Sequence, residues 1–403
     1  MAGYRRYVFG WFFAAIGTQI QGMAIGWEMY QRTGEALSLG LVGLMQAVPT
    51  MLLALPAGFI ADRYNRLHLV TLSMIGMTVT SLGLAVLSLY EGPTELMYML
   101  LFLDAAFVMF GRPARIALLP QIVPREVFAN AVTWNSSLFQ ITSVAGPAIG
   151  GFILLWHIPA AYIICAMSSL LFIIWIQGLT FHHIPEKIKE PASFRTVLAG
   201  IDFLREKRIL LIIISLDLFA VLLGGAVYLL PIFAEDILKV DARGFGWLNA
   251  APAVGSFLMA ILIAHLPPMV KAGRNLLLAV GGFGIATILF GLSESFWLSM
   301  FMLFLTGALD NISMVIRHTL LQMLTPDQMR GRVSAVSSVF IGASNELGGL
   351  ESGMVAHWFG PVFSVVSGGI GTIVVVTTMA IISPALRKLG SLKGESRDEI
   401  EVN

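Results

Sequence analysis

Long uninterrupted runs of apolar residues dominate the chain, and short polar segments separate them. A helix that crosses a bilayer needs about 20 mostly apolar residues, because each residue advances it by about 1.5 Å. The runs do not alternate between apolar and polar residues, as the strands of a membrane β-barrel would. We therefore predict an all-α membrane protein with twelve transmembrane helices, at residues 7–30, 37–61, 67–90, 95–116, 127–155, 158–180, 209–234, 244–266, 275–293, 296–316, 333–356 and 361–384.

The longest polar segment divides the chain near its middle. Residues 181–208 begin with a polar stretch and end with apolar residues that alternate with charged ones, a pattern typical of an amphipathic helix on a membrane surface. We therefore expect an N-terminal six-helix bundle at 1–180 and a cytoplasmic linker at 181–208. A C-terminal six-helix bundle with a short cytoplasmic tail is expected at 209–403.

The two halves resemble each other when one is shifted by 202 residues. The matching pairs include Arg115 with Arg317, Gly146 with Gly348, and Gly151 with Gly353. A repeat of six helices is the pattern of secondary transporters in which two bundles move about a central site. Chance recurrence of Gly and Leu is the alternative, and the collinear order of the matches disfavours it. The repeat predicts two pseudo-symmetric bundles.

The basic residues indicate which ends of the spans face the cytoplasm. With the N-terminus inside, 22 of the 25 Lys and Arg residues fall in inside segments, and only Arg32, Lys239 and Arg243 fall outside. Cytoplasmic loops of membrane proteins carry such an excess of Lys and Arg. Both termini and the linker are therefore predicted to be cytoplasmic. The net charge is only +1, so no nucleic-acid partner is expected.

The composition supports a membrane protein, and the absence of known motifs excludes several other classes of protein. Hydrophobic residues make up 57% of the chain and charged residues 12%, whereas about 25% are charged in a typical soluble domain. The sequence lacks a phosphate-binding loop, a His-Glu-x-x-His zinc motif and a Gly-x-Ser-x-Gly nucleophile motif. Cys165 is the only cysteine, so an intrachain disulfide is impossible. We therefore expect no enzyme, no metal site, no cofactor and no nucleotide-driven motor in this chain.

Six carboxylates fall inside predicted spans, where an ionisable side chain is costly and marks a candidate functional site. They are Glu28, Asp104, Asp217, Asp310, Glu346 and Glu351. Asp104 should lie close to the bilayer midplane, about 13 Å into its span. A structural role is the alternative for each acid. Asp310 and Arg317 lie two turns apart on one helix face, and Glu346 and Glu351 suit contacts between helices equally well.

The segment after the second span reads Gly58-Phe-Ile-Ala-Asp62-Arg63-Tyr-Asn65-Arg66. It resembles the signature of the major facilitator superfamily between helices two and three, with Asn65 in place of the usual Gly. Asn tolerates the left-handed backbone conformation, so the turn is expected to survive. We expect Gly58 to allow a close helix approach. Asp62 should lie near the positive N-terminal end of span eleven when the protein is open outward.

The resemblance implies a cytoplasmic gating motif built from this segment and nearby basic residues. Its predicted members are Gly58, Asp62, Arg63, Arg66, Arg112, Arg115, Arg330 and Arg332.

The fifth span carries Gly146-Pro147-Ala-Ile-Gly150-Gly151. This resembles the antiporter signature of the drug-efflux branches of the superfamily, Gly-Pro-x-x-Gly-Gly. Pro147 removes one backbone donor and bends the helix, and the glycines allow tight packing on a neighbour. The resemblance favours export, and a generic kinked helix is the alternative.

A further resemblance covers nearly the whole chain. The matching segments start at Trp27, Arg112, Asn130 and Gln322. They look like the drug:proton antiporter branch that contains the enterobactin exporter and macrolide efflux pumps. In the superfamily fold, helices one, four, seven and ten surround the central cavity. The acids on those helices are Glu28, Asp104, Asp217 and Asp310, which makes them the candidates for proton coupling and substrate contact. Many drug exporters carry an arginine in span four. Asp104 stands in that place here, which puts an arginine-based proton relay in doubt.

We therefore expect a secondary active transporter in a bacterial cytoplasmic (inner) membrane. It should export a small lipophilic or siderophore-like compound in exchange for protons, with Asp104 as the main coupling site. Its expected partners are the substrate, protons and the lipid bilayer, and no oligomer is required. The alternatives are a lipid-like or metal-linked substrate, import, or a non-transporting receptor or scaffold. A scaffold gains nothing from titratable acids at the midplane.

Overall fold

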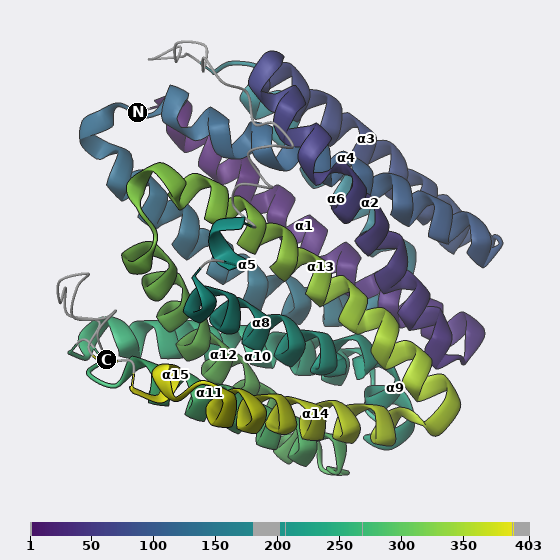
Figure 1. The fold of residues 1–403 in the computed structure, drawn as a ribbon. Helices are drawn as coiled ribbons and strands as arrows, with labels where there is room; N and C mark the ends of the chain where they lie inside the picture. The colour runs from purple at the N-terminus through teal and green to yellow at the C-terminus, as the bar shows by residue number, and fades with distance from the viewer. Residues whose placement is uncertain (1, 180–201, 206, 268, 389, 391–403) are drawn as a thin grey trace. The chain divides into compact units, whose positions relative to one another are not determined.

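The computed structural model describes residues 2–179, 202–205, 207–267, 269–388 and 390, and helices make up most of this part of the chain (Figure 1). No strand occurs among these residues. Eleven helices in the described part are long and apolar enough to cross a membrane. Most of the predicted linker at 181–208 lies outside the described residues, and its residues 202–205 are helical.

Helical segments cover all twelve predicted spans, which confirms the all-α membrane fold. The first half contains α1 (Ala2–Thr33), α2 (Ala36–Arg63), α3 (Arg66–Leu89), α4 (Thr94–Ile122), η1 (Arg125–Val127), α5 (Phe128–Trp156) and α6 (Ile158–Ile176). The second half contains α8 (Arg208–Leu223), η2 (Gly225–Leu229), α9 (Leu230–Ile232), η3 (Phe233–Ile237), α10 (Ala242–His265), α11 (Ala272–Gly291), α12 (Phe296–Leu324), α13 (Asp327–Phe359), α14 (Pro361–Ile382) and α15 (Pro384–Lys388). α13 covers the predicted span at 333–356 and is 33 residues long.

The chain forms two compact units, and two helices contribute to both. Unit 1 contains α1, α3 to α6, most of α2 and the first residues of α10. Unit 2 contains α8, α9, α11 to α15, the rest of α10 and the first residues of α2. In unit 1, α1 packs on α5 and α6, and α3 packs on α4 and α6. In unit 2, α8 packs on α13 and α14, and α11 packs on α12 and α14. The same order of contacts occurs twice, as an internal six-helix repeat produces.

Apolar side chains fill the interior of each unit and also cover much of its outside. In unit 1, the buried Tyr7 and Phe172 rings meet edge to face with centroids 5.9 Å apart. Leu72, Val79 and Ile174 are instead exposed on the helix surfaces. A soluble domain would keep such a large apolar surface from water, whereas lipid chains accommodate it.

The seventh predicted span is not one continuous α-helix. α8 ends at Leu223, and the chain continues through the 3₁₀ turns of η2, the short α9 and the π-helical η3. Gly225 begins the irregular part, and a Cβ built there would lie 2.6 Å from the carbonyl oxygen of Gly348 in α13. Irregular backbone at membrane depth is tolerated where protein covers it. Leu229 and Leu230 are buried, and η2 packs on α13 and α14 of unit 2, so protein covers this segment.

Candidate functional site: carboxylates inside the two units

Asp104 lies in the interior of unit 1, on α4, with 8% of its surface exposed. Thr80 of α3 donates a 2.6 Å hydrogen bond to its Oδ1, and Gln21 of α1 donates a 3.3 Å bond to its Oδ2. Both partners are neutral, and no ion pair with Asp104 occurs among the residues that the structure describes. A carboxylate in this setting can bind and release a proton without breaking a salt bridge.

Glu28 differs from Asp104 because it has a cationic partner. Its Oε1 lies 2.6 Å from Arg32, and its Oε2 accepts a 2.7 Å hydrogen bond from the Tyr162 hydroxyl. Arg32 also donates to the carbonyl oxygens of Gly92 at 2.7 Å and Leu87 at 3.0 Å. These bonds tie the end of α1 to α6 and to the turn between α3 and α4. The arrangement agrees with the structural alternative for Glu28.

In unit 2, Arg317 of α12 lies between two carboxylates. Its Nη1 forms an ion pair with Asp217 of α8, and its Nη2 lies 3.8 Å from Asp310. The Arg317 and Asp217 side chains are buried, whereas the Asp310 side chain is 50% exposed. The sequence suggested a pair of Arg317 with Asp310 on one helix. In the structure Arg317 also pairs with Asp217, which lies on a different helix, and this contact is closer than the one with Asp310.

The other two predicted intramembrane acids lie on α13. Glu346 accepts a 2.8 Å hydrogen bond from Tyr228, which belongs to the irregular η2. Glu351 accepts a 3.4 Å bond from the neighbouring Ser352. Within the described part of the chain, no group of three or more His, Cys, Asp or Glu side chains is arranged to hold a metal ion.

The turn between α2 and α3 contradicts one expectation about the gating motif. Asn65 has φ −62° and ψ 117°, so it is extended and not left-handed. Its side-chain oxygen accepts hydrogen bonds from the backbone of Leu67 at 2.9 Å and His68 at 3.4 Å. The expected left-handed Asn65 is therefore wrong, because Asn here caps the start of α3, a position that requires extended backbone and favours Asn.

Three other residues of the predicted gating motif, Gly58, Arg66 and Arg115, can be described within unit 1. A Cβ at Gly58 would meet no heavy atom of unit 1 within 4 Å, so the expected close helix approach is not found within this unit. Arg66 donates a 3.0 Å hydrogen bond to the Ala117 carbonyl and so joins α3 to α4. The Arg115 guanidinium lies 3.3 Å above the centre of the Trp11 ring.

The exposed end of α2 carries Asp62 and Arg63, and Arg112 is exposed on α4. Arg330 and Arg332 belong to the first turns of α13. The predicted latch between Asp62 and this helix end joins residues of the two units and stays a prediction.

The antiporter motif on α5 provides close contacts with two helices. A Cβ on Gly150 would lie 3.3 Å from the Met23 sulfur of α1, and one on Gly151 would lie 3.0 Å from the Cα of Gly246 in α10. A Cβ on Gly146 would also press against α1, and Pro147 lies inside the continuous α5.

Unit 2 contains a matching glycine contact between α13 and the first residues of α2. A Cβ on Gly353 would lie 2.5 Å from the Cα of Gly40. Gly353 is also the residue that the internal repeat pairs with Gly151 of the antiporter motif.

We expect Gly246→Leu to destabilise the protein, because the new side chain would point into the backbone of α5, which cannot turn aside as a flexible side chain can. A cost of about 1–3 kcal/mol is typical of overpacking. The midpoint of thermal unfolding in detergent measures it. The matched control is Gly22→Leu in α1, where a Cβ meets nothing within 4 Å. Equal midpoints for the two variants would contradict the prediction.

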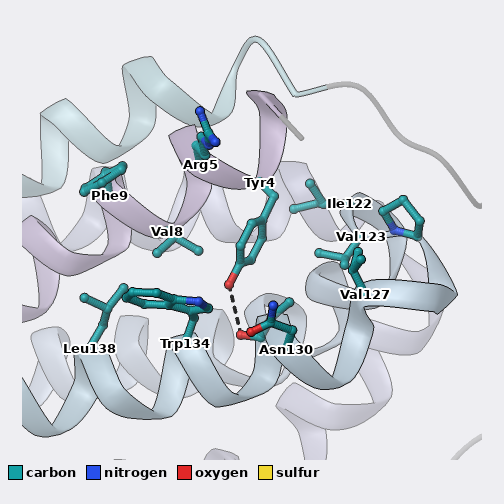
Figure 2. A pocket seen from close by; sticks show the side chains of 12 residues that line it. Tyr4, Arg5, Val8, Phe9, Ile122, Val123, Val127, Asn130, Trp134 and Leu138 are labelled. Carbon is teal, nitrogen blue, oxygen red and sulfur yellow. Dashed lines mark hydrogen bonds between the residues drawn. The ribbon is translucent and has the colours of Figure 1, made fainter.

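Sequence reasoning missed an apolar pocket of about 400 Å³ at the N-terminal end of unit 1 (Figure 2). Side chains from the start of α1, the end of α4, η1 and the start of α5 line it, among them Tyr4, Val8, Val127 and Trp134. The Tyr4 hydroxyl donates a 2.9 Å hydrogen bond to the Ala131 carbonyl across the pocket. The lining comes from two stretches far apart in the chain, residues 4–9 and 122–138, so no local pattern reveals it.

Comparison with known proteins places the chain in a family. The model of the family described as transmembrane secretion effector, a major facilitator family, matches residues 2–402. The chain belongs to this family. This chain is similar to enterobactin exporters of Escherichia coli O1:K1 and of Shigella boydii serotype 18. Each is 24% identical over 383 residues, which cover 94% of this chain and 91% of the exporter.

Solved transporter structures share the fold of this chain. An inward-facing bacterial homologue of the lysosomal transporter Spinster matches with a TM-score of 0.72 at 15% identity, over 96% of each chain. The nucleoside transporter NupG matches with a TM-score of 0.74 at 15% identity, over 95% of this chain and 99% of its own. The predicted membership of the major facilitator superfamily is confirmed. The chain is a multi-pass membrane transporter and not an enzyme.

Proposed function

We propose that this protein exports a small lipophilic or siderophore-like compound across the bacterial cytoplasmic membrane in exchange for protons, by alternating access between its two units. The observation that carries the proposal is Asp104, an intramembrane carboxylate whose hydrogen-bond donors in the described part of the chain, Gln21 and Thr80, are neutral. The antiporter motif on α5 and the similarity to enterobactin exporters along the whole chain support export.

Proton and substrate compete for the same carboxylate in this mechanism. Burial from water disfavours the charged form of Asp104, and the bonds from Thr80 and Gln21 partly compensate. The deprotonated form attracts a cationic or hydrogen-bond-donating part of the substrate, and the protonated form does not. Because binding of one ligand lowers the affinity for the other, release of substrate on one side is coupled to uptake of a proton there.

The surroundings of the other acids make them weaker coupling candidates. A proton that binds Asp217 first has to break a buried ion pair with Arg317. Glu28 pairs with Arg32 in the same way. Asp310 is half exposed and lies 3.8 Å from its cation, so it is the second candidate after Asp104.

A lipid-like substrate is the second candidate function, because the pocket in Figure 2 is lined mainly by apolar and aromatic side chains. Competition by a lysophospholipid against the transported dye would support it. Insensitivity of transport to Val8→Trp, which fills the pocket, would count against it.

Reconstitution into liposomes tests the transport class. With an imposed pH gradient, we expect lipophilic dyes or a catecholate compound to move against their own gradient, and to stop moving when an ionophore collapses the pH difference. Movement that ignores the pH gradient would contradict proton coupling. A protein that moves none of these compounds in either direction would support the receptor or scaffold alternative.

We propose that both termini and the linker lie in the cytoplasm, on the strength of the distribution of basic residues. Glu190→Cys and Ser391→Cys should therefore resist a membrane-impermeant maleimide in intact cells and react after permeabilisation. Glu95→Cys, at the predicted outer end, is the positive control. The native Cys165 is buried and adds no background. Labelling of either cytoplasmic position in intact cells would contradict this orientation.

A further inference from the structure

A cluster of polar side chains occupies the core of unit 1 beside Asp104, where α1, α3 and α6 meet. Its buried members are Gln21, Thr80, Ser81, Cys165 and Ser169. The Cys165 side chain lies beside Thr18, Ser81 and Ser169, and it is near Asp104. Three helices thus contribute polar groups to one place inside an otherwise apolar bundle. We call this set the core polar cluster.

Three atoms of the core polar cluster have no hydrogen-bond partner of ordinary geometry within the described residues. They are Gln21 Oε1, Ser81 Oγ and Ser169 Oγ, one on each of the three helices. The Cys165 thiol that adjoins the two hydroxyls is only a weak hydrogen-bonding group. Buried polar atoms are nearly always satisfied by protein or by internal water. Three such atoms on neighbouring helices are the kind of hydrogen-bond partners that an internal water needs.

Polar groups continue from the core polar cluster toward a second pocket of unit 1, which Glu28 and Arg32 line. Tyr162 lies one turn before Cys165 on α6, and its hydroxyl donates to Glu28. Glu28 and Arg32 line a pocket of about 660 Å³ together with Glu91 and Glu95. This pocket lies at the turn between α3 and α4, which the charge distribution places on the outer side.

We infer that the core polar cluster holds internal water and forms a proton path from the pocket at Glu28 to Asp104, inside unit 1. The inference rests on the proposed role of Asp104 as the coupling site. A proton enters from water in the pocket, and each water or hydroxyl group along the path accepts one proton and releases another. The Asp104 carboxylate takes the last proton and becomes a carboxylic acid. The proton thereby reaches Asp104 through the helix bundle of unit 1, and it does not travel along the path that the substrate takes.

The sole cysteine allows a direct test of hydration. The S–H stretch in the infrared spectrum belongs to Cys165 alone, and it shifts when deuterium replaces the proton. After transfer of the reconstituted protein into D₂O, we expect this S–H group to exchange at least about tenfold faster than the amides of the membrane helices, because internal water reaches it without unfolding. An S–H band that persists as long as those amides would overturn the proposal.

A double variant tests whether protons use the path. Ser81→Ala with Ser169→Ala removes two hydroxyl groups at little cost in volume. We expect roughly a tenfold slower pH-driven accumulation of dye, with substrate exchange at equal pH reduced much less. The matched control is Ser73→Ala on α3, a buried serine that donates to the Phe107 carbonyl outside the core polar cluster. An unchanged pH-driven rate in the double variant, or an equal fall of both rates, would overturn the proposal.

The two proposals fail separately. If Asp104→Asn keeps normal coupling, the proposed function loses its coupling site, whatever the exchange rate of the Cys165 thiol. If Asp104→Asn loses coupling while the thiol stays unexchanged, Asp104 keeps its role and the proton path through the core polar cluster is wrong.

Discussion

Asp104→Asn should abolish substrate accumulation driven by a pH gradient and leave the protein folded. Asn has nearly the volume of Asp and mimics its protonated form, so the packing of α4 is retained. Its amide can still accept the bond from Thr80, and the unpartnered Gln21 Oε1 offers an acceptor for its NH₂ group once the Gln21 amide rotates. Without a titratable group, proton binding and substrate binding are no longer linked. Accumulation of dye in proteoliposomes under an imposed pH gradient measures the effect.

The control for this experiment is Asp241→Asn, which removes an exposed carboxylate between η3 and α10 that pairs with Arg243. It should accumulate substrate as the unmodified protein does. Downhill movement of a neutral substrate should survive in Asp104→Asn, which separates loss of coupling from loss of transport. Normal coupling in Asp104→Asn would exclude Asp104 from the mechanism and make Asp310 the next candidate.

Arg317→Met should be the most destabilising single change among those discussed. Met fills a similar apolar volume but leaves the buried Asp217 carboxylate without its cation. Breaking a buried ion pair by removing one partner costs about 3–5 kcal/mol. The unfolding midpoint in denaturant or heat should fall accordingly. Arg243→Met, which breaks an exposed pair with Asp241, is the control and should cost less than about 1 kcal/mol.

The double variant Asp217→Asn with Arg317→Met shows why Arg317→Met loses stability. If the uncompensated charge destabilises Arg317→Met, neutralising Asp217 should restore a large part of the stability. A double variant no more stable than Arg317→Met alone would mean that Arg317 stabilises unit 2 through packing and not through its charge.

The number and order of the membrane helices follow from the sequence because lipid permits few alternatives to a long apolar helix. Details inside the spans do not follow in this way. Gly224 and Gly225 break the seventh span within a run that stays apolar, so mean hydropathy is the same for regular and irregular backbone. α4 continues to Ile122, beyond the predicted end at residue 116, because Pro113 and the basic residues near it do not stop the helix.

The candidate acids could also be found from the sequence, but their partners could not. A carboxylate in an apolar run stands out in any hydropathy profile, as Asp104 and Asp217 do. Only tertiary packing brings Thr80 to Asp104 and Arg317 to Asp217, since the residues of each pair lie on different helices. Local backbone conformation also could not be predicted at Asn65. Asn is compatible with both a left-handed turn and a helix cap, and only the fold selects the cap.

The exchange of helix ends between the two units has a consequence for how the protein is made. Unit 1 includes the first residues of α10, which are synthesised after the linker and after the seventh span. The face of α5 at Gly151 therefore lacks its neighbour Gly246 while the N-terminal half emerges from the ribosome. The start of α2 at Gly40 lacks its neighbour Gly353 for even longer, because α13 is synthesised later still. Neither half can complete its own packing alone, so final assembly depends on translation reaching nearly the end of the chain.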